Sequence, residues 1–101
     1  MERKRLIFKI IDDNKEILRK IGIKSIGVFG SVVRGEDTKY SDYDILVEFE
    51  KEHRKLNSFS KLCDFLDNNL GEKYDLITTD GLSPHFGKQI LKEVQYVDIN
   101  P

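Results

Sequence analysis

The residues with the clearest chemical potential lie between positions 29 and 47, where a glycine-serine turn precedes two closely spaced aspartates. An apolar run ends abruptly at Gly30-Ser31, as a buried strand does when it enters a turn that allows close approach to its backbone. A short helical turn beginning at Ser31 would direct backbone N–H groups and a hydroxyl at an anion, with Arg34 one turn further on. This arrangement predicts a phosphate-binding turn with Gly30, Ser31 and Arg34 as its candidate residues.

Asp42 and Asp44 enter the next apolar run with one residue between them. Side chains of a strand alternate with a period of two, so both carboxylates are expected on one face. Two carboxylates repel each other by roughly 4 kcal/mol at about 4 Å and an effective dielectric constant of about 20, and a divalent cation removes that cost. Mg²⁺ favours carboxylate and phosphate oxygens. The pair therefore predicts a metal–nucleotide site, for which Asp75 in a later strand pattern is the candidate third acid.

Other uses of these residues are less consistent with the sequence. An EF-hand is excluded because, counting from Asp42, the sixth position is Val47 and the twelfth is His53, where glycine and glutamate are required. A Walker loop is excluded because no Gly-Lys-Ser/Thr follows Gly30. The structural alternative is a solvated turn acid followed by an acid at the strand edge. Arg34 has two open roles, contact with a phosphate or bracing of the loop against a carboxylate.

Length and composition limit the classes of protein to consider. The 101 residues predict a single domain over 1–101, without room for a separate substrate domain. A net charge of −1 with 35% charged residues gives no overall cationic field, so direct contact with nucleic acid is not expected. The single cysteine, Cys63, excludes an internal disulfide and favours the cytoplasm. Lys9 interrupts the short apolar run near the N-terminus, so we expect no signal peptide or membrane span.

The spacing of apolar residues predicts three helices and four strands that must position the polar residues. The expected elements are a helix over 3–21 ended by Gly22, strands over 23–29 and 43–49, a helix capped at Asn57 or Ser58 and ended by Gly71, a strand over 73–79, a helix capped by Ser83 with an apolar stripe at Phe86, Ile90, Leu91 and Val94, and a short strand over 96–98. This order predicts an α+β fold in which helices pack on a small mixed sheet.

One known family shares the pattern of functional residues. The chain resembles the nucleotidyltransferase superfamily related to DNA polymerase beta in having Gly30-Ser31, ten residues, and then Asp42-x-Asp44. Arg34-Gly35 within the gap and Asp75 on a later strand extend the resemblance, which covers nearly the whole chain. The small size is similar to the minimal branch, the MNT or MntA-like proteins, whose usual partners are HEPN-domain RNases. The resemblance implies the polymerase beta-like nucleotidyltransferase fold.

The resemblance also implies a role for each candidate residue. Gly30 and Ser31 would hold the triphosphate of ATP, and Asp42 and Asp44 would bind two Mg²⁺ ions. Asp75 would share one metal and help to deprotonate the attacking hydroxyl. The implied reaction transfers AMP from ATP to a tyrosine of a HEPN toxin, which makes the chain the antitoxin of a toxin–antitoxin pair.

Two other functions stay open on the sequence alone. The chain could neutralise a toxin without catalysis, by binding and covering its active site. It could also be a small-molecule nucleotidyltransferase of the aminoglycoside-modifying kind. The sequence leaves the nucleotide base and the oligomeric state open, including assembly with itself or with a partner.

Overall fold

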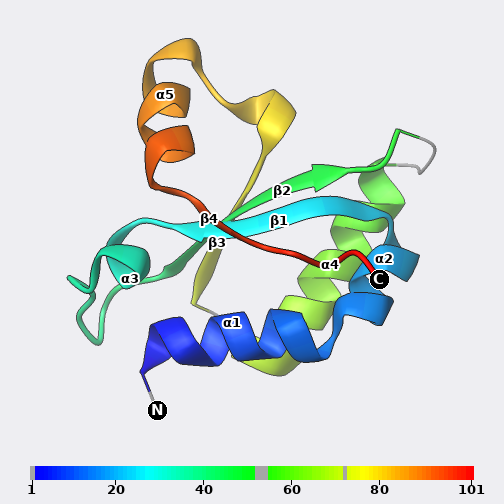
Figure 1. Cartoon of the computed structure of the whole chain (residues 1–101), viewed down its shortest axis with the longest axis horizontal. Coiled ribbons are helices and arrows are strands. Elements are labelled where there is room, and N and C mark those ends of the chain that lie inside the picture. Colours follow the sequence, from blue (N-terminus) through cyan, green and yellow to red (C-terminus); the bar gives the residue numbers. More distant parts are fainter. Residues whose placement is uncertain (1, 52–54, 72) are drawn as a thin grey trace.

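The fold is organised by a four-stranded mixed sheet in the part of the chain that the computed structural model describes, residues 2–51, 55–71 and 73–101. The strands lie in the order β3-β2-β1-β4 (Figure 1), and their bounds are Ile23–Phe29 for β1, Tyr43–Phe49 for β2, Tyr74–Thr78 for β3 and Gln95–Val97 for β4. The helices are α1 (Arg3–Asp13), α2 (Lys15–Ile21), α3 (Ser31–Arg34), α4 (Lys55–Leu70) and α5 (Pro84–Glu93), and a 3₁₀ turn, η1, spans Thr79–Gly81. The predicted α+β class is confirmed.

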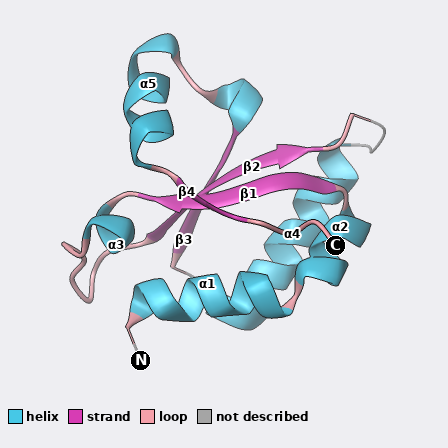
Figure 2. Ribbon diagram, viewed as in Figure 1, coloured by secondary structure: helices cyan, strands magenta, loops and turns pink. Residues whose placement is uncertain are grey.

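Strand directions bring three strand ends together. β1 pairs antiparallel with β2 and β4, whereas β2 and β3 are parallel. The C-terminal end of β1 and the N-terminal ends of β2 and β3 therefore lie at one end of the sheet (Figure 2). The predicted bounds 23–29 and 43–49 are both confirmed.

One face of the sheet carries the hydrophobic core. α1, α2 and α4 lie on this face, and α5 lies on the other side (Figure 1). Ile45 and Val47 of β2 are fully buried in the core with Ile7 of α1 and Leu62 of α4. Because side chains alternate along a strand, Asp44 and Leu46 face the opposite side, on which α5 lies.

The first helix differs from its prediction. A single helix was expected over 3–21, but Asn14 separates α1 from α2 with φ −121° and ψ 25°. Its side-chain amide donates a hydrogen bond to the carbonyl of Ile10 at 2.7 Å. Asparagine side chains compete for backbone hydrogen-bonding groups in this way and thereby favour helix ends, so the prediction of one continuous helix is wrong.

The start of α4 also differs. Asn57 and Ser58 were the predicted caps, but the helix begins at Lys55. Ser58 is buried, and its hydroxyl donates to the carbonyl of Ile21 at 2.7 Å. The serine therefore ties α4 to the end of α2 and does not cap its own helix.

Other helix boundaries are as predicted. Gly22 ends α2 in a left-handed conformation, and Gly71 follows α4 with a positive φ. Ser83 caps α5, since its hydroxyl accepts from the N–H of Phe86 at 3.1 Å. The final strand begins one residue earlier than expected, at Gln95.

No helix among the described residues has the length and apolar character that a membrane span requires.

Gly27 allows β4 to lie close to β1. A Cβ at this position would lie 2.6 Å from Val94 Cγ2 and 3.1 Å from the backbone oxygen of Gln95. Gly27→Ala is therefore expected to cost about 1–3 kcal/mol, as overpacking of a core does. Thermal unfolding followed by circular dichroism should show a melting temperature lower by roughly 4–8 °C for each kcal/mol.

A substitution on the same strand provides the control for Gly27→Ala. Ser25→Ala adds no atom and should change the free energy of unfolding by less than about 0.5 kcal/mol. Equal melting temperatures for Gly27→Ala and the wild-type chain would contradict the close contact with β4.

Candidate active site

The three predicted acids lie at the strand ends that meet at one end of the sheet. In the strand register, Phe29 of β1 pairs with Asp44 of β2, and Asp44 pairs with Asp75 of β3. Asp42 lies two residues before Asp44, immediately before β2. Asp44 is half-buried, whereas Asp42 and Asp75 are exposed. Asp75 is thus a direct neighbour of Asp44, on the strand that pairs with β2.

Electrostatic repulsion links these carboxylates. Burial raises the pKa of Asp44 above its ordinary value, and the negative charges of Asp75 and Asp42 raise it further. The positive charge of Arg34 acts in the opposite direction. Ionised Asp44 is therefore held in an unfavourable field that a bound cation would relieve.

The donor chemistry at this end of the sheet suits Mg²⁺, which favours carboxylate oxygens. Within the described ranges 2–51, 55–71 and 73–101, however, no three carboxylate, histidine or cysteine side chains are already gathered as a metal centre. The convergence of Asp42, Asp44 and Asp75 on one ion stays a prediction.

The predicted phosphate-binding turn packs directly against Asp44. Gly30 has φ +81° and ψ −160°, and a Cβ in its place would lie 2.0 Å from Asp44 Oδ2. Only glycine combines this backbone conformation with such close approach. α3 begins at the next residue, and the carbonyl of Gly30 accepts hydrogen bonds from Val33 N and Arg34 N at 3.1 and 3.2 Å. The turn and the half-buried acid therefore form one unit.

Glu93, at the end of α5, joins this unit from a distant part of the chain. Its Oε2 accepts a hydrogen bond from the N–H of Gly30 at 2.8 Å, and its Oε1 pairs with Nη1 of Arg34. Partial burial opposes ionisation of Glu93, but the hydrogen bonds from Arg34 and Gly30 outweigh it and lower the pKa of the carboxyl. Arg34 Nε also pairs with Glu36 at 3.2 Å. The pKa of Arg34 is raised by Glu93 first and by Glu36 second.

Glu93 is not among the predicted site residues. Of the two roles left open for Arg34, these contacts are of the bracing kind, and its contact with phosphate stays a prediction. Glu93 lies 63 residues from Gly30, so no local motif connects them. The available signal was a carboxylate in the last turn of a helix, where the helix dipole disfavours negative charge and a partner outside the helix is expected.

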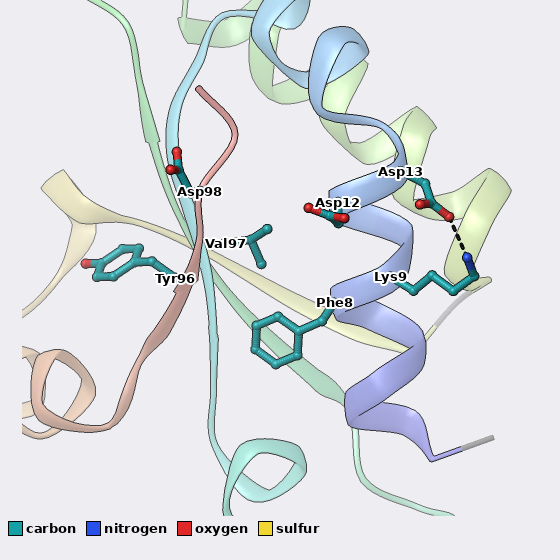
Figure 3. Close-up of a pocket in the computed structure, with 7 residues that line it drawn as sticks. All are labelled: Phe8, Lys9, Asp12, Asp13, Tyr96, Val97 and Asp98. Atoms are coloured by element: carbon teal, nitrogen blue, oxygen red, sulfur yellow. Dashed lines mark hydrogen bonds and ion pairs between the residues drawn. The ribbon is translucent and has the colours of Figure 1, made fainter. Parts of the chain in front are cut away.

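The surface has one hollow beside the Gly30 turn and another of similar size away from it. The first, here called the turn hollow, has a volume of about 510 Å³ and is lined by Phe29, Gly30, Arg34, Phe86, Gln89, Ile90, Lys92 and Glu93. The second, of about 500 Å³, lies between α1 and β4 (Figure 3) and is lined by Phe8, Lys9, Asp12, Asp13, Tyr96, Val97 and Asp98. Only the turn hollow includes predicted site residues.

Comparison with known proteins places the chain in a family. The family model described as a nucleotidyltransferase domain matches residues 8–97, which is most of the chain. The chain belongs to the nucleotidyltransferase domain family. The protein adenylyltransferase MntA of Thermococcus cleftensis is 45% identical to this nucleotidyltransferase over 83 residues, covering 82% of this chain and 83% of the relative.

Solved structures agree with this assignment. A candidate minimal nucleotidyltransferase superposes with a TM-score of 0.69 and 33% identity, over 87% of this chain and 93% of the other. An MNT antitoxin solved in complex with a tri-AMPylated HEPN toxin of Shewanella oneidensis matches in fold, with a TM-score of 0.56, 20% identity and coverage of 88% and 70%. The predicted family and fold are confirmed, and the nucleotidyltransferase is an enzyme.

Proposed function

We propose that this nucleotidyltransferase transfers AMP from ATP to a tyrosine hydroxyl of a HEPN-domain toxin and so acts as a cytoplasmic antitoxin. The observation that carries the proposal is the contact between the Gly30 turn and Asp44, with Asp75 beside Asp44 in the strand register. A relative of 45% identity that is named a protein adenylyltransferase supports AMP transfer to a protein. The complex of an MNT antitoxin with an AMPylated HEPN toxin supports the class of partner.

Each candidate residue has a defined role in the proposed reaction. Gly30 and Ser31 would bind the triphosphate at the start of α3, and Asp42 and Asp44 would hold two Mg²⁺ ions, with Asp75 as a further ligand of one of them. When bound, the metal ions neutralise charge on the attacking and leaving oxygens. The tyrosine oxygen forms a bond to the α-phosphorus, its proton passes to the carboxylate of Asp75, and the bond to the bridging oxygen breaks to release pyrophosphate. Such transfer depends mainly on positioning and charge neutralisation.

Neutralisation by binding alone is the second candidate function, and it requires a surface that contacts the toxin. Phe86 and Leu91 on α5 are 64% and 54% exposed, and Phe86 lines the turn hollow. Exposed apolar side chains beside a site are typical of a surface that contacts another protein. Such contact would serve either occlusion of the toxin or delivery of its tyrosine to the site.

An assay of toxin neutralisation distinguishes the catalytic function from occlusion. The RNase activity of a HEPN partner is measured after incubation with this chain, ATP and Mg²⁺. With the wild-type chain we expect loss of RNase activity at amounts well below one chain per toxin, because a catalyst turns over. The Asp42→Asn/Asp44→Asn double variant should not neutralise.

A charge-matched control accompanies this test. Asp12→Asn/Asp64→Asn removes two exposed carboxylates outside the site and should neutralise like the wild-type chain. If the Asp42→Asn/Asp44→Asn variant neutralises equally well, or if ATP has no effect, occlusion replaces the enzymatic proposal.

A further inference from the structure

Glu93 has an unusual place for a carboxylate. It is the last residue of α5, where the helix dipole disfavours negative charge, and its side chain is only 24% exposed. Each carboxylate oxygen accepts from a different group of the predicted phosphate-binding turn, Oε2 from the N–H of Gly30 and Oε1 from the guanidinium of Arg34. The two contacts span the turn, so the position of Glu93 determines the position of both donors.

We propose that Glu93 is a positioning residue of the nucleotidyltransferase site, which holds the Gly30 turn and the Arg34 guanidinium in the conformation that binds the triphosphate. The inference rests on the proposed function because it concerns the same phosphate-binding turn. It adds a residue of α5 to a site that is otherwise built from β1, α3, β2 and β3.

Glu93 takes the place of a local helix cap. In a capping box, an acidic or amide side chain at the third helical position reaches back to the backbone N–H of the cap residue. The cap residue of α3 is Gly30, and the third position is Val33, which has no acceptor. Glu93 accepts from that N–H instead. The N–H groups of Ser31 and Val32, at the first helical positions, have no partner within the helix and are therefore available to the proposed triphosphate.

The contacts of Glu93 leave other donors of the turn available for the proposed phosphate. The carboxylate binds the N–H that precedes α3, and not those of its first turn. The contacts of Arg34 with Glu93 and Glu36 use Nη1 and Nε, so the guanidinium retains Nη2 for a phosphate. The Arg34 side chain is 45% exposed, which allows a ligand to reach it.

The sheet fixes Glu93 itself. Val94, the next residue, packs against Gly27 of β1, and its N–H donates to the carbonyl of Ile90 at 2.8 Å. β4 then pairs with β1, with Gln95 opposite Val28. The carboxylate is therefore anchored beside the same end of β1 that leads into the Gly30 turn, which is what a positioning role requires.

The test measures binding of ATP with Mg²⁺ by isothermal titration calorimetry, together with the amide signal of Gly30 in ¹H–¹⁵N NMR spectra. Glu93→Ala should weaken ATP binding about tenfold, the low end of the range for outer-shell positioning partners. It should also raise KM for ATP more than it lowers kcat. Glu93→Gln preserves the shape of the side chain and should weaken ATP binding less than Glu93→Ala does. If Glu93→Ala does not fold, the ATP affinity of Glu93→Gln tests the inference.

Glu36→Gln is the matched control, because Glu36 contacts Arg34 and not Gly30. It should change ATP affinity less than about twofold and leave the Gly30 amide signal in place, whereas both Glu93 variants should shift that signal. Unchanged or tighter ATP binding in the Glu93 variants would overturn the inference, and tighter binding would identify the carboxylate as a competitor of phosphate.

The proposed function can fail separately. If the wild-type chain binds ATP normally but modifies no HEPN partner, the proposed acceptor is wrong. The role of Glu93 is then decided by the ATP-binding data alone. A wild-type chain that does not bind ATP overturns both.

Discussion

Gly30→Ala is expected to reduce AMP transfer at least about a hundredfold, because the added methyl group occupies the position of the Asp44 carboxylate. The new Cβ would lie 2.0 Å from Oδ2 and 2.9 Å from Cγ of Asp44. The Asp44 carboxylate must then move by about 1 Å, and a misplacement of about 1 Å lowers the reaction rate about 10²-fold. Transfer is measured as the initial rate of AMP incorporation into the partner, with the melting temperature recorded in parallel.

Gly35→Ala separates the clash from backbone strain. Gly35 also has a positive φ, +73°, but a Cβ there would meet nothing within 4 Å. Both alanine variants should lose stability through their positive φ, about 1–2 kcal/mol at Gly35 in the left-handed helical conformation and about 1–3 kcal/mol at Gly30, whose ψ of −160° lies in a region almost restricted to glycine. Gly30→Ala alone should lose transfer activity. Similar activity in the two variants would show that contact between Gly30 and Asp44 is unimportant for the reaction.

Asp44→Asn is expected to slow transfer severely and yet raise the thermal stability of the metal-free chain. The folded-state pKa of Asp44 lies above its ordinary value of 3.8, first through burial and then through the charges of Asp75 and Asp42. A raised carboxyl pKa contributes stability below the unfolded value and loses it as pH rises through the folded pKa. At neutral pH the ionised group therefore opposes folding, and the neutral amide removes this cost.

The effect of Asp44→Asn should depend on pH. The gain in melting temperature is expected at neutral pH and should disappear as pH falls below about 3.8, where aspartate is neutral in both states. Transfer should fall about a thousandfold, since metal ions contribute several kcal/mol and each 1.36 kcal/mol is about tenfold in rate. Asp64→Asn, an exposed acid of α4, serves as control for charge. A lower melting temperature, or retained transfer, would contradict the account of Asp44.

The contribution of Glu93 to stability should change with pH in the direction opposite to that of Asp44. Its pKa is lowered because the hydrogen bonds from Arg34 and Gly30 outweigh burial. It therefore contributes stability above its ordinary value of 4.5, and this contribution is lost as pH falls through the lower folded pKa. Acid thus releases the contact between α5 and the turn while it relieves repulsion at Asp44.

The parts of the fold that could be predicted depend on local pattern. β1 and β2 were predicted at their observed bounds because each is an apolar run bounded by turn residues. The break at Asn14 was missed because the apolar spacing continues across it. Ser58 was assigned as a cap from its residue type, whereas its partner, the carbonyl of Ile21, is set by tertiary packing.

The site likewise contains residues that local sequence predicts and one that it does not. Gly30 and Asp44 are close in sequence, and the antiparallel pairing of β1 with β2, which sets Phe29 opposite Asp44, brings them together. Glu93 reaches Gly30 from 63 residues away, through the pairing of β4 with β1, so no pattern within the motif predicts it. The apolar stripe of α5 was recognised, but Phe86 remains 64% exposed, because periodicity predicts an apolar face and not what covers it.

Intact-mass spectrometry of a HEPN-domain partner tests AMP transfer most directly. The partner is incubated with this chain, ATP and Mg²⁺, and its mass is compared with that after incubation with the Asp42→Asn/Asp44→Asn variant. We expect a mass increase of one or more AMP units with the wild-type chain and none with the variant. An unmodified partner in a stable complex with the wild-type chain would contradict catalysis and leave occlusion as the function.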